Sequence, residues 1–219
     1  MSTIPNLERI GERIRQAFEL KNTARDQALS RSRELIRFCS LCIRAVHREE
    51  FDVAHELLQT ARRAAEALKA GLAEYPDLYH AGYTQDALKE YAEAAATYAL
   101  TRGLPLPEPE ELGVEHATYL NGLAEAAGEL RRHAVDRIRL DQIERGNRLL
   151  DIMDEIYDLL VIMDYPDAIT GGLRRNTDMV RGVTERTRGD LMLAARQEKL
   201  EKALTRFEAD VSAGAGDAA

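Results

Sequence analysis

The sequence contains few residues that interrupt helices: among 219 residues there are 14 glycines and 6 prolines. It also lacks alternating runs of valine, isoleucine and threonine, which are typical of half-buried strands. Alanine, leucine, glutamate and arginine dominate instead, and these residues have high intrinsic helix propensity. The composition therefore predicts an all-α protein, and 45% hydrophobic residues are enough for the core of a single domain.

Long apolar runs are absent as well. No stretch approaches the ~20 apolar residues of a membrane span, and the N-terminus lacks the apolar core of a signal peptide. We therefore expect a cytoplasmic protein without membrane contact. The formal net charge of −8 excludes attraction of nucleic acid by bulk charge. Nucleic-acid binding would require a local basic surface.

Cysteine is scarce, and the two that occur are Cys39 and Cys42. Their CxxC spacing is found in redox sites and in one half of a zinc site, but no second CxxC or nearby histidine pair accompanies them. Apolar residues surround both, so we expect buried thiols. The sequence also contains no glycine-rich phosphate loop, nucleophile elbow or Ser/His/Asp arrangement.

Apolar residues at helical spacing predict a bundle of six or seven helices, separated by segments that contain proline. We expect one domain over residues 1–210 and a disordered tail of small residues over 211–219. The first and last helices far exceed the average length of ~11–12 residues, which favours self-association. The expected helices cover approximately residues 5–49, 51–74, 86–100, 115–139, 140–163 and 172–207.

Two of the expected helices carry paired glutamates: Glu90 and Glu93 on the third, Glu125 and Glu129 on the fourth. Residues three or four apart share one side of a helix. Small and apolar residues surround both pairs, whereas exposed helix faces usually carry interleaved lysines. If the two faces meet, four carboxylates converge and need a cation, and hard oxygen ligands favour Mg²⁺ or Mn²⁺. The alternative is two solvated pairs, since glutamate is a common helix former.

Two further patterns leave their roles open. Di-iron bundles use Glu-x-x-His motifs, and none occurs here; His133 follows Glu129 by one helical turn and is a ligand, a proton carrier or a structural residue. A second acidic cluster lies opposite an apolar helix face, and we interpret it as a solvated face or a subunit contact. It consists of Asp151, Asp154, Glu155 and Asp158.

Four arginines form one stripe along the first expected helix, opposite its apolar face. Such a stripe is most often a solvated surface. This one contains little acid, so contact with nucleic acid is the competing interpretation. The members of this arginine stripe are Arg33, Arg37, Arg44 and Arg48.

The segments 89–94 (KEYAEA), 101–103 (TRG) and 119–130 (YLNGLAEAAGEL) resemble the translin family, specifically its translin-associated factor X branch, in a prokaryotic form. The resemblance spans roughly residues 30–207. It implies an α-helical bundle that assembles into a hollow, barrel-like octamer. Translin itself binds RNA and single-stranded DNA, and the factor X branch supplies metal-dependent endoribonuclease activity from acidic residues that face the interior.

The resemblance also assigns the four acids. Glu90 and Glu93 match the Glu-x-x-Glu of that branch, Glu129 matches its later glutamate, and Glu125 stands where aspartate is usual. The resemblance therefore implies a Mg²⁺- or Mn²⁺-dependent endoribonuclease that acts on single-stranded or open RNA, with these glutamates as catalytic metal ligands and the arginine stripe on the RNA backbone. The alternative is a non-catalytic homo-oligomer that binds RNA or single-stranded DNA.

Overall fold

The computed structural model describes residues 4–216, including the side chains of residues 4–209. Within this part of the chain all regular structure is helical, which confirms the all-α class. Six helices are long, as the sequence predicts, and the turns between them contain three four-residue helices that it does not predict. The helices are α1 (Leu7–His47), α2 (Phe51–Ala70), α3 (Pro76–Tyr79), α4 (Gly82–Arg102), α5 (Pro109–Leu112), α6 (His116–Arg139), α7 (Ile143–Val161), α8 (Asp167–Thr170) and α9 (Leu173–Gly216).

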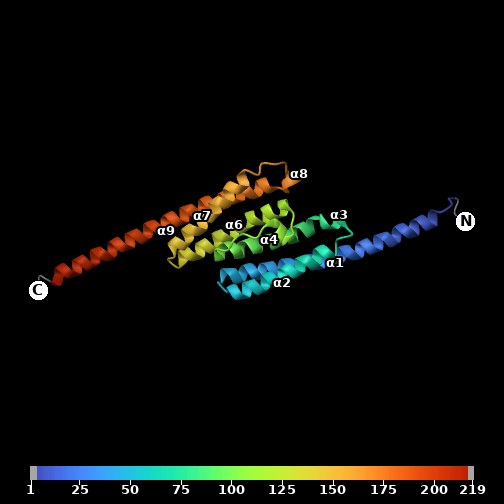
Figure 1. The fold of residues 1–219 in the computed structure, drawn as a ribbon. Helices are drawn as coiled ribbons and strands as arrows, with labels where there is room; N and C mark the ends of the chain where they lie inside the picture. The colour runs from blue at the N-terminus through green and yellow to red at the C-terminus, as the bar shows by residue number, and fades with distance from the viewer. Residues whose placement is uncertain (1–3, 217–219) are drawn as a thin grey trace.

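Helices α4 and α6 lie side by side at the centre of the bundle (Figure 1). Helices α1 and α2 pack on one side of this pair, and α7 and α9 pack on the other. The core is divided in the same way. Leu35 and Leu88 are fully buried in the cluster of α1, α2 and α4, and Leu130 and Met153 in the cluster of α6, α7 and α9. Because α4 contributes to both clusters, the two halves form one bundle.

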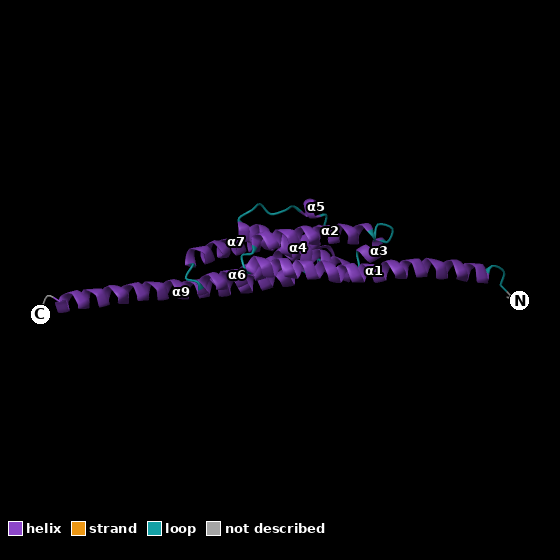
Figure 2. Cartoon of the chain, turned by 90° about the horizontal axis from the view of Figure 1, so that it is seen from below, coloured by secondary structure: helices purple, strands orange, loops and turns teal. Residues whose placement is uncertain are grey.

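The segment between α4 and α6 decides how these two helices run relative to each other. Helix α4 ends at Arg102, where Gly103 adopts the left-handed conformation with φ 67°. A proline-rich stretch follows and runs back along the bundle to α5 (Figure 2). Tyr119 at the start of α6 donates a hydrogen bond to the Pro107 carbonyl of this stretch. Helix α6 therefore begins beside the beginning of α4, and the two helices are parallel.

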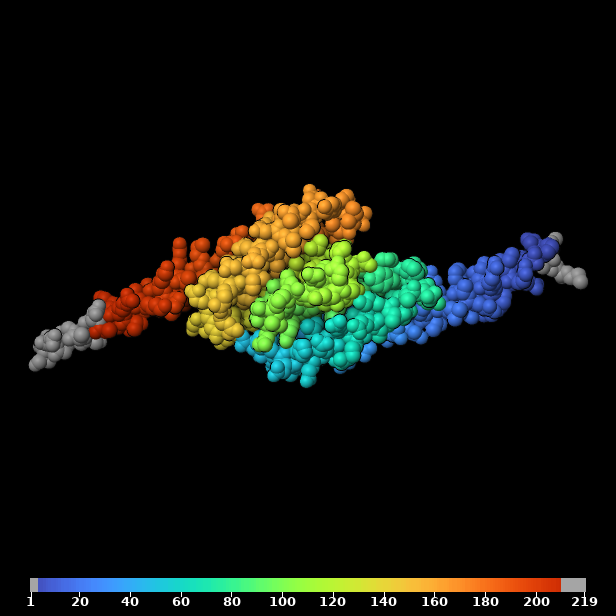
Figure 3. Space-filling view, viewed as in Figure 1, coloured from blue at the N-terminus to red at the C-terminus, as the bar shows by residue number. Residues whose placement is uncertain are grey.

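Both long terminal helices project from the bundle at opposite ends (Figures 1 and 3). We call residues 7–27 the N-arm and residues 192–209 the C-arm; most of their side chains are exposed. Each arm carries an exposed apolar stripe at helical spacing. These residues are Leu7, Ile10, Ile14 and Phe18 on the N-arm and Leu193, Leu200, Leu204 and Phe207 on the C-arm.

Helix α9 continues to Gly216, so its backbone is helical beyond residue 210, where the sequence predicts the start of a disordered tail. The remainder of that predicted tail, residues 217–219, lies outside the described residues. Of the helices that the structure describes, none is long and apolar enough to cross a membrane.

Candidate metal centre

The contact between α4 and α6, which we call the seam, depends on Gly122. A Cβ atom at this position would lie 2.7 Å from the Lys89 carbonyl oxygen and 3.0 Å from the Glu93 amide nitrogen. Only a residue without a side chain permits this approach of two backbones. One turn earlier, Thr118 donates a hydrogen bond of 2.6 Å to Gln85 across the same seam. The parallel register therefore sets the glutamates of α4 level with those of α6.

Three of the four candidate ligands converge at the seam. Glu90, Glu93 and Glu125 each offer a carboxylate oxygen, and these oxygens all lie within 4.8 Å of one another. Glu129 is close enough for its charge to raise the pKa of both Glu90 and Glu93. The carboxylate of Glu129 itself pairs with His47. Three candidate ligands are thus placed to share one ion, with the fourth adjacent.

Burial controls the charge of this cluster. The Glu93 side chain is only 7% exposed. Its burial, followed by the charges of the neighbouring glutamates, raises the pKa of Glu93 to about 8. Burial also raises the pKa of Glu90 above its ordinary value. Without a strong cation, therefore, a proton stays on Glu93 near neutral pH.

Lys89 is the one cation of the seam that reaches two of the converging acids, among the residues whose side chains are described. Its Nζ atom lies 2.6 Å from Glu125 Oε1 and 3.8 Å from Glu90 Oε1. Burial opposes the charge of Lys89, but the hydrogen bond and charge of Glu125 outweigh it and raise the pKa of Lys89. An ammonium group thus partly neutralises the cluster.

Glu129 is held by His47, which reaches the seam from the end of α1. The His47 Nε2 atom lies 2.5 Å from Glu129 Oε2, and this interaction lowers the pKa of Glu129. The ring of His133 lies behind, with its centroid 6.1 Å from that of His47. Burial lowers the pKa of His133 to about 4, so its ring is neutral at pH 7. His133 therefore packs against the histidine that orients Glu129.

This donor set fits a hard divalent cation. Carboxylate oxygens are the protein ligands that Mg²⁺ and Mn²⁺ prefer. Burial, and after it the charges of the neighbouring glutamates, raises the pKa of Glu93, and a divalent ion would stabilise its carboxylate more fully than Lys89 alone. An outer group that fixes a ligand's orientation, as His47 does for Glu129, is common around metal sites.

Comparison with known proteins places this chain in a family. No family model matches the chain. An uncharacterised protein of Methanocaldococcus jannaschii is 30% identical over 195 residues, which cover 88% of this chain and 86% of that protein. The crystal structure of AfC3PO is 32% identical with a TM-score of 0.79, over 85% of this chain and 97% of that one. C3PO structures are of the translin type. The chain belongs to the translin family.

Two further structures agree with this assignment. AfC3PO in a complex with duplex RNA is 31% identical, with a TM-score of 0.78, over 85% of this translin-family chain and 96% of that chain. Apo-NeC3PO has a TM-score of 0.77 over 89% of this chain and 100% of its own. At 24% identity, NeC3PO supports the fold alone.

In this translin-family structure the arginine stripe lies on the outside of α1. All four arginines are exposed. At about 100° per residue they lie opposite the buried positions Leu35, Cys39 and Val46. None of their side chains makes an ion pair or hydrogen bond within residues 4–209. The structure does not bring the stripe to the acids, and its contact with RNA stays a prediction.

The two cysteines are free and buried, which confirms the expectation of buried thiols. Cys42 donates a hydrogen bond to the Ala54 carbonyl. Burial raises the pKa of both thiols, that of Cys42 to about 12, so neither is a thiolate at neutral pH. This environment fits packing between α1 and α2 rather than redox or metal chemistry.

The second acidic cluster lies on the exposed side of α7. Asp151, Glu155 and Asp158 are exposed, and Asp154 pairs with Arg188 of α9 at 2.7 Å. No three of these four acids form a metal-binding group among the described residues. The cluster is a solvated face with one link to the neighbouring helix.

The roles of two residues of the site could not be predicted from the sequence. Lys89 directly precedes Glu90, but its bond to Glu125, 36 positions later, depends on the parallel register of α4 and α6. His47 is 82 positions from Glu129, and no local pattern connects them. The CxxC of the same helix is the more conspicuous motif, although it lies in the core.

Proposed function

We propose that this translin-family protein is a divalent-metal-dependent endoribonuclease that acts on single-stranded or open RNA. The observation that carries the proposal is the convergence of Glu90, Glu93 and Glu125 within 4.8 Å. These three residues would hold Mg²⁺ or Mn²⁺, and Glu129 would join them as the fourth ligand. AfC3PO, to which this chain is similar, forms a complex with duplex RNA. That complex supports RNA as the class of ligand.

When bound, the ion would activate a water molecule and stabilise charge on the phosphate oxygens. The chain's own residues prepare the site for it. Glu93 must release its proton for the ion to bind, His47 fixes the orientation of Glu129, and Lys89 balances Glu125. We assign the arginine stripe to RNA backbone away from the cut, because its exposed guanidinium groups can reach phosphates without moving the core.

We also propose that the chain forms a homo-oligomer, with the hollow octamer of the family as the expected form. The apolar stripes of the N-arm and C-arm support this, because isolated helices with such stripes bury them against a partner. Size-exclusion chromatography with light scattering measures the mass directly. A monomer would contradict the assembly but leave the seam unaffected.

The nuclease is tested with a fluorescent single-stranded RNA incubated with Mn²⁺, with and without chelator. We expect cleavage that stops on chelation and is lost in the double variant Glu125→Ala, Glu129→Ala. The matched control is Asp151→Ala, Glu155→Ala, which removes two acids from the exposed face of α7. Loss of cleavage in both double variants, or in neither, would contradict the assignment of the seam.

The second candidate is a non-catalytic oligomer that binds RNA or single-stranded DNA. Two of the acids already have partners without metal, which favours this candidate: Lys89 pairs with Glu125, and His47 binds Glu129. Under this alternative the labelled RNA is bound but remains intact in Mn²⁺, and the double variant binds it as tightly as the wild type.

A further inference from the structure

The ammonium group of Lys89 lies between two of the converging acids. Its Nζ atom is 2.6 Å from Glu125 Oε1 and 3.8 Å from Glu90 Oε1, so it joins one acid of α6 to one of α4. Both acids belong to the group whose oxygens lie within 4.8 Å of one another. A cation that contacts two of these three acids takes up oxygens that a metal ion would need as ligands.

The third converging acid has no such partner. Glu93 is 7% exposed and makes no hydrogen bond or ion pair with a described residue. Burial and the neighbouring glutamates raise the pKa of Glu93, and Lys89 lowers it only in part. One ammonium group therefore leaves a buried carboxyl group unpaired beside it. A single positive charge is too little for three acids.

The backbone of Lys89 is fixed, but its side chain has a second place to go. The Lys89 carbonyl oxygen lies at the closest approach of the seam, 2.7 Å from where a Cβ of Gly122 would be. The side chain is 21% exposed and lines a hollow of about 520 Å³ between α4, α6 and the α8–α9 turn. The walls of this hollow are net acidic. Among the described residues its acids are Asp86, Glu115 and Glu125, and Lys89 is its one lysine or arginine.

Asp86 is the acid of this hollow that is available to the ammonium group. It precedes Lys89 by three positions, so both side chains lie on one side of α4. Asp86 is exposed and makes no hydrogen bond or ion pair with a described residue, whereas Glu115 accepts a hydrogen bond from Tyr79. Its charge also contributes, after that of Glu125, to the raised pKa of Lys89. Rotation of the lysine side chain can therefore exchange one carboxylate for another without movement of the backbone.

We propose that Lys89 is an internal counter-ion of the metal centre, located between Glu125 and Glu90 when the site is without metal and turned to Asp86 when metal is bound. The proposal rests on the metal centre of the proposed function, and it adds a device that sets the affinity of that centre. Because the bond between Lys89 and Glu125 must break before Glu125 becomes a ligand, Lys89 raises the metal concentration at which the site fills.

The test is the affinity for Mg²⁺, measured by isothermal titration calorimetry at pH 8.5, where protons compete little for Glu93. We expect Lys89→Met to bind Mg²⁺ about tenfold more tightly than the wild type, because a positive charge next to the ion and an ion pair that must break are both removed. Lys89→Arg keeps the charge and should bind no more tightly than the wild type. The matched control is Lys21→Met on the N-arm, whose lysine pairs with Asp77 at 2.5 Å; it should leave the affinity unchanged.

Asp86→Asn tests the second position of the lysine. It should weaken Mg²⁺ binding about threefold more in the wild type than in Lys89→Met, because only a lysine that must leave Glu125 needs Asp86. Additive effects of the two substitutions would overturn the transfer to Asp86.

A Mg²⁺ affinity of Lys89→Met equal to or below that of the wild type would overturn the role of Lys89 as a counter-ion, while leaving the metal centre in place. Absence of Mg²⁺ binding in both proteins would contradict the metal centre itself and the counter-ion with it. Should Lys89→Met fail to fold, as circular dichroism would reveal, Lys89→Gln takes its place in both comparisons.

Discussion

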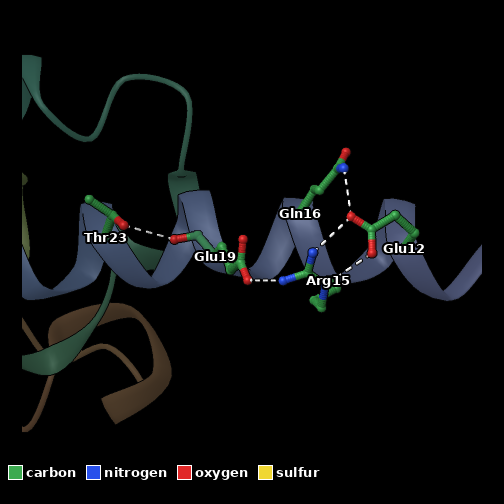
Figure 4. Close-up of polar contacts among 5 residues, drawn as sticks. All are labelled: Glu12, Arg15, Gln16, Glu19 and Thr23. Atoms are coloured by element: carbon green, nitrogen blue, oxygen red, sulfur yellow. Dashed lines mark hydrogen bonds and ion pairs between the residues drawn. The ribbon is translucent and has the colours of Figure 1, made fainter.

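The N-arm and the seam between α4 and α6 are both helical and rich in glutamate, but they are held together differently. On the N-arm, Arg15 donates hydrogen bonds to Glu12 at 2.8 Å and to Glu19 at 2.5 Å, all within one helix (Figure 4). At the seam, Lys89 bonds Glu125, 36 positions away, across two helices. The N-arm contacts are local and exposed, whereas the seam contacts are long-range and shielded.

The same side chain therefore has opposite properties in the two regions. Hydrogen bonds from Arg15 lower the pKa of Glu12 on the exposed N-arm. Burial raises the pKa of Glu93 at the seam to about 8. Water and a local arginine stabilise one carboxylate, while the other loses its water and gains acidic neighbours. A glutamate becomes a candidate metal ligand through its surroundings rather than through its helix.

The largest effect that tests this comparison is expected at two glycines of α6. We expect Gly122→Ala to lower the free energy of unfolding by about 2–3 kcal/mol, because its Cβ would overlap the α4 backbone. Gly128→Ala is the matched control on the same helix, with no atom within 4 Å of its added Cβ. It should be stabilising by up to about 1 kcal/mol through helix propensity. Urea unfolding measures both, and equal effects would contradict a tight seam.

The next effect is the pH dependence of stability that we expect from Glu93. Its folded-state pKa of about 8 lies above the ordinary value of 4.5. Between pH 4.5 and 8 the folded protein keeps this proton while the unfolded chain loses it. The contribution of Glu93 to stability is therefore greatest below pH 4.5, and it falls as the pH rises towards 8. In chelator we expect the free energy of unfolding to fall by a few kcal/mol across this range, as urea unfolding at several pH values would measure.

The controls for this effect are Glu93→Gln and added Mn²⁺. Glu93→Gln should remove most of the slope, because glutamine does not titrate. In the wild type, Mn²⁺ binding near neutral pH should release about one proton, which calorimetry in buffers of different ionisation enthalpy detects. A slope that persists in Glu93→Gln would assign the pH dependence to another group.

The apolar stripe of the N-arm should matter for assembly and little for the bundle. Ile10 and Ile14 are 41% and 45% exposed in the single chain. We expect Ile10→Ser, Ile14→Ser to change the unfolding free energy of a separated chain by less than about 0.5 kcal/mol. The mass measured by light scattering should fall. An unchanged oligomer would exclude this stripe from the interface.

The smallest effect is expected at Arg15. Exposed pairs within a helix contribute only about 0.2–0.5 kcal/mol each. Arg15→Ala should therefore lower stability by less than about 1 kcal/mol, and added salt should reduce even that. Thermal unfolding at low and high salt measures it. A loss as large as that of Gly122→Ala would show that the N-arm is not independent of the bundle.

The sequence predicts the helices well because they depend on local signals. Periodic apolar residues and the prolines near 76, 105 and 166 mark their bounds to within four residues, except at the end of α9, which runs nine residues beyond the expected 207. The pairing of glutamates on one face is equally local, since it follows from spacing along one helix. The exposed arginine stripe and the buried thiols follow from the same periodicity, as the burial of α1 bears out.

Contacts between helices could not be obtained in this way. The parallel register of α4 and α6 depends on the return of the 103–115 segment along the bundle, and proline spacing does not specify its path. That register gives Lys89 its bond to Glu125, and the packing of α1 beside the pair brings His47 to Glu129. A hollow of about 520 Å³ between α4, α6 and the α8–α9 turn is likewise formed by elements that meet only in the folded chain.

By itself, the sequence determined an all-α bundle and which glutamates share a helix face, because helix formation and amphipathicity are decided over a few residues. Tertiary structure alone decided that three of these carboxylates lie within 4.8 Å of one another and that one keeps a proton near neutral pH. The physical reason is that burial and the nearness of like charges are properties of the packed chain. They depend on a glycine that lets two backbones touch.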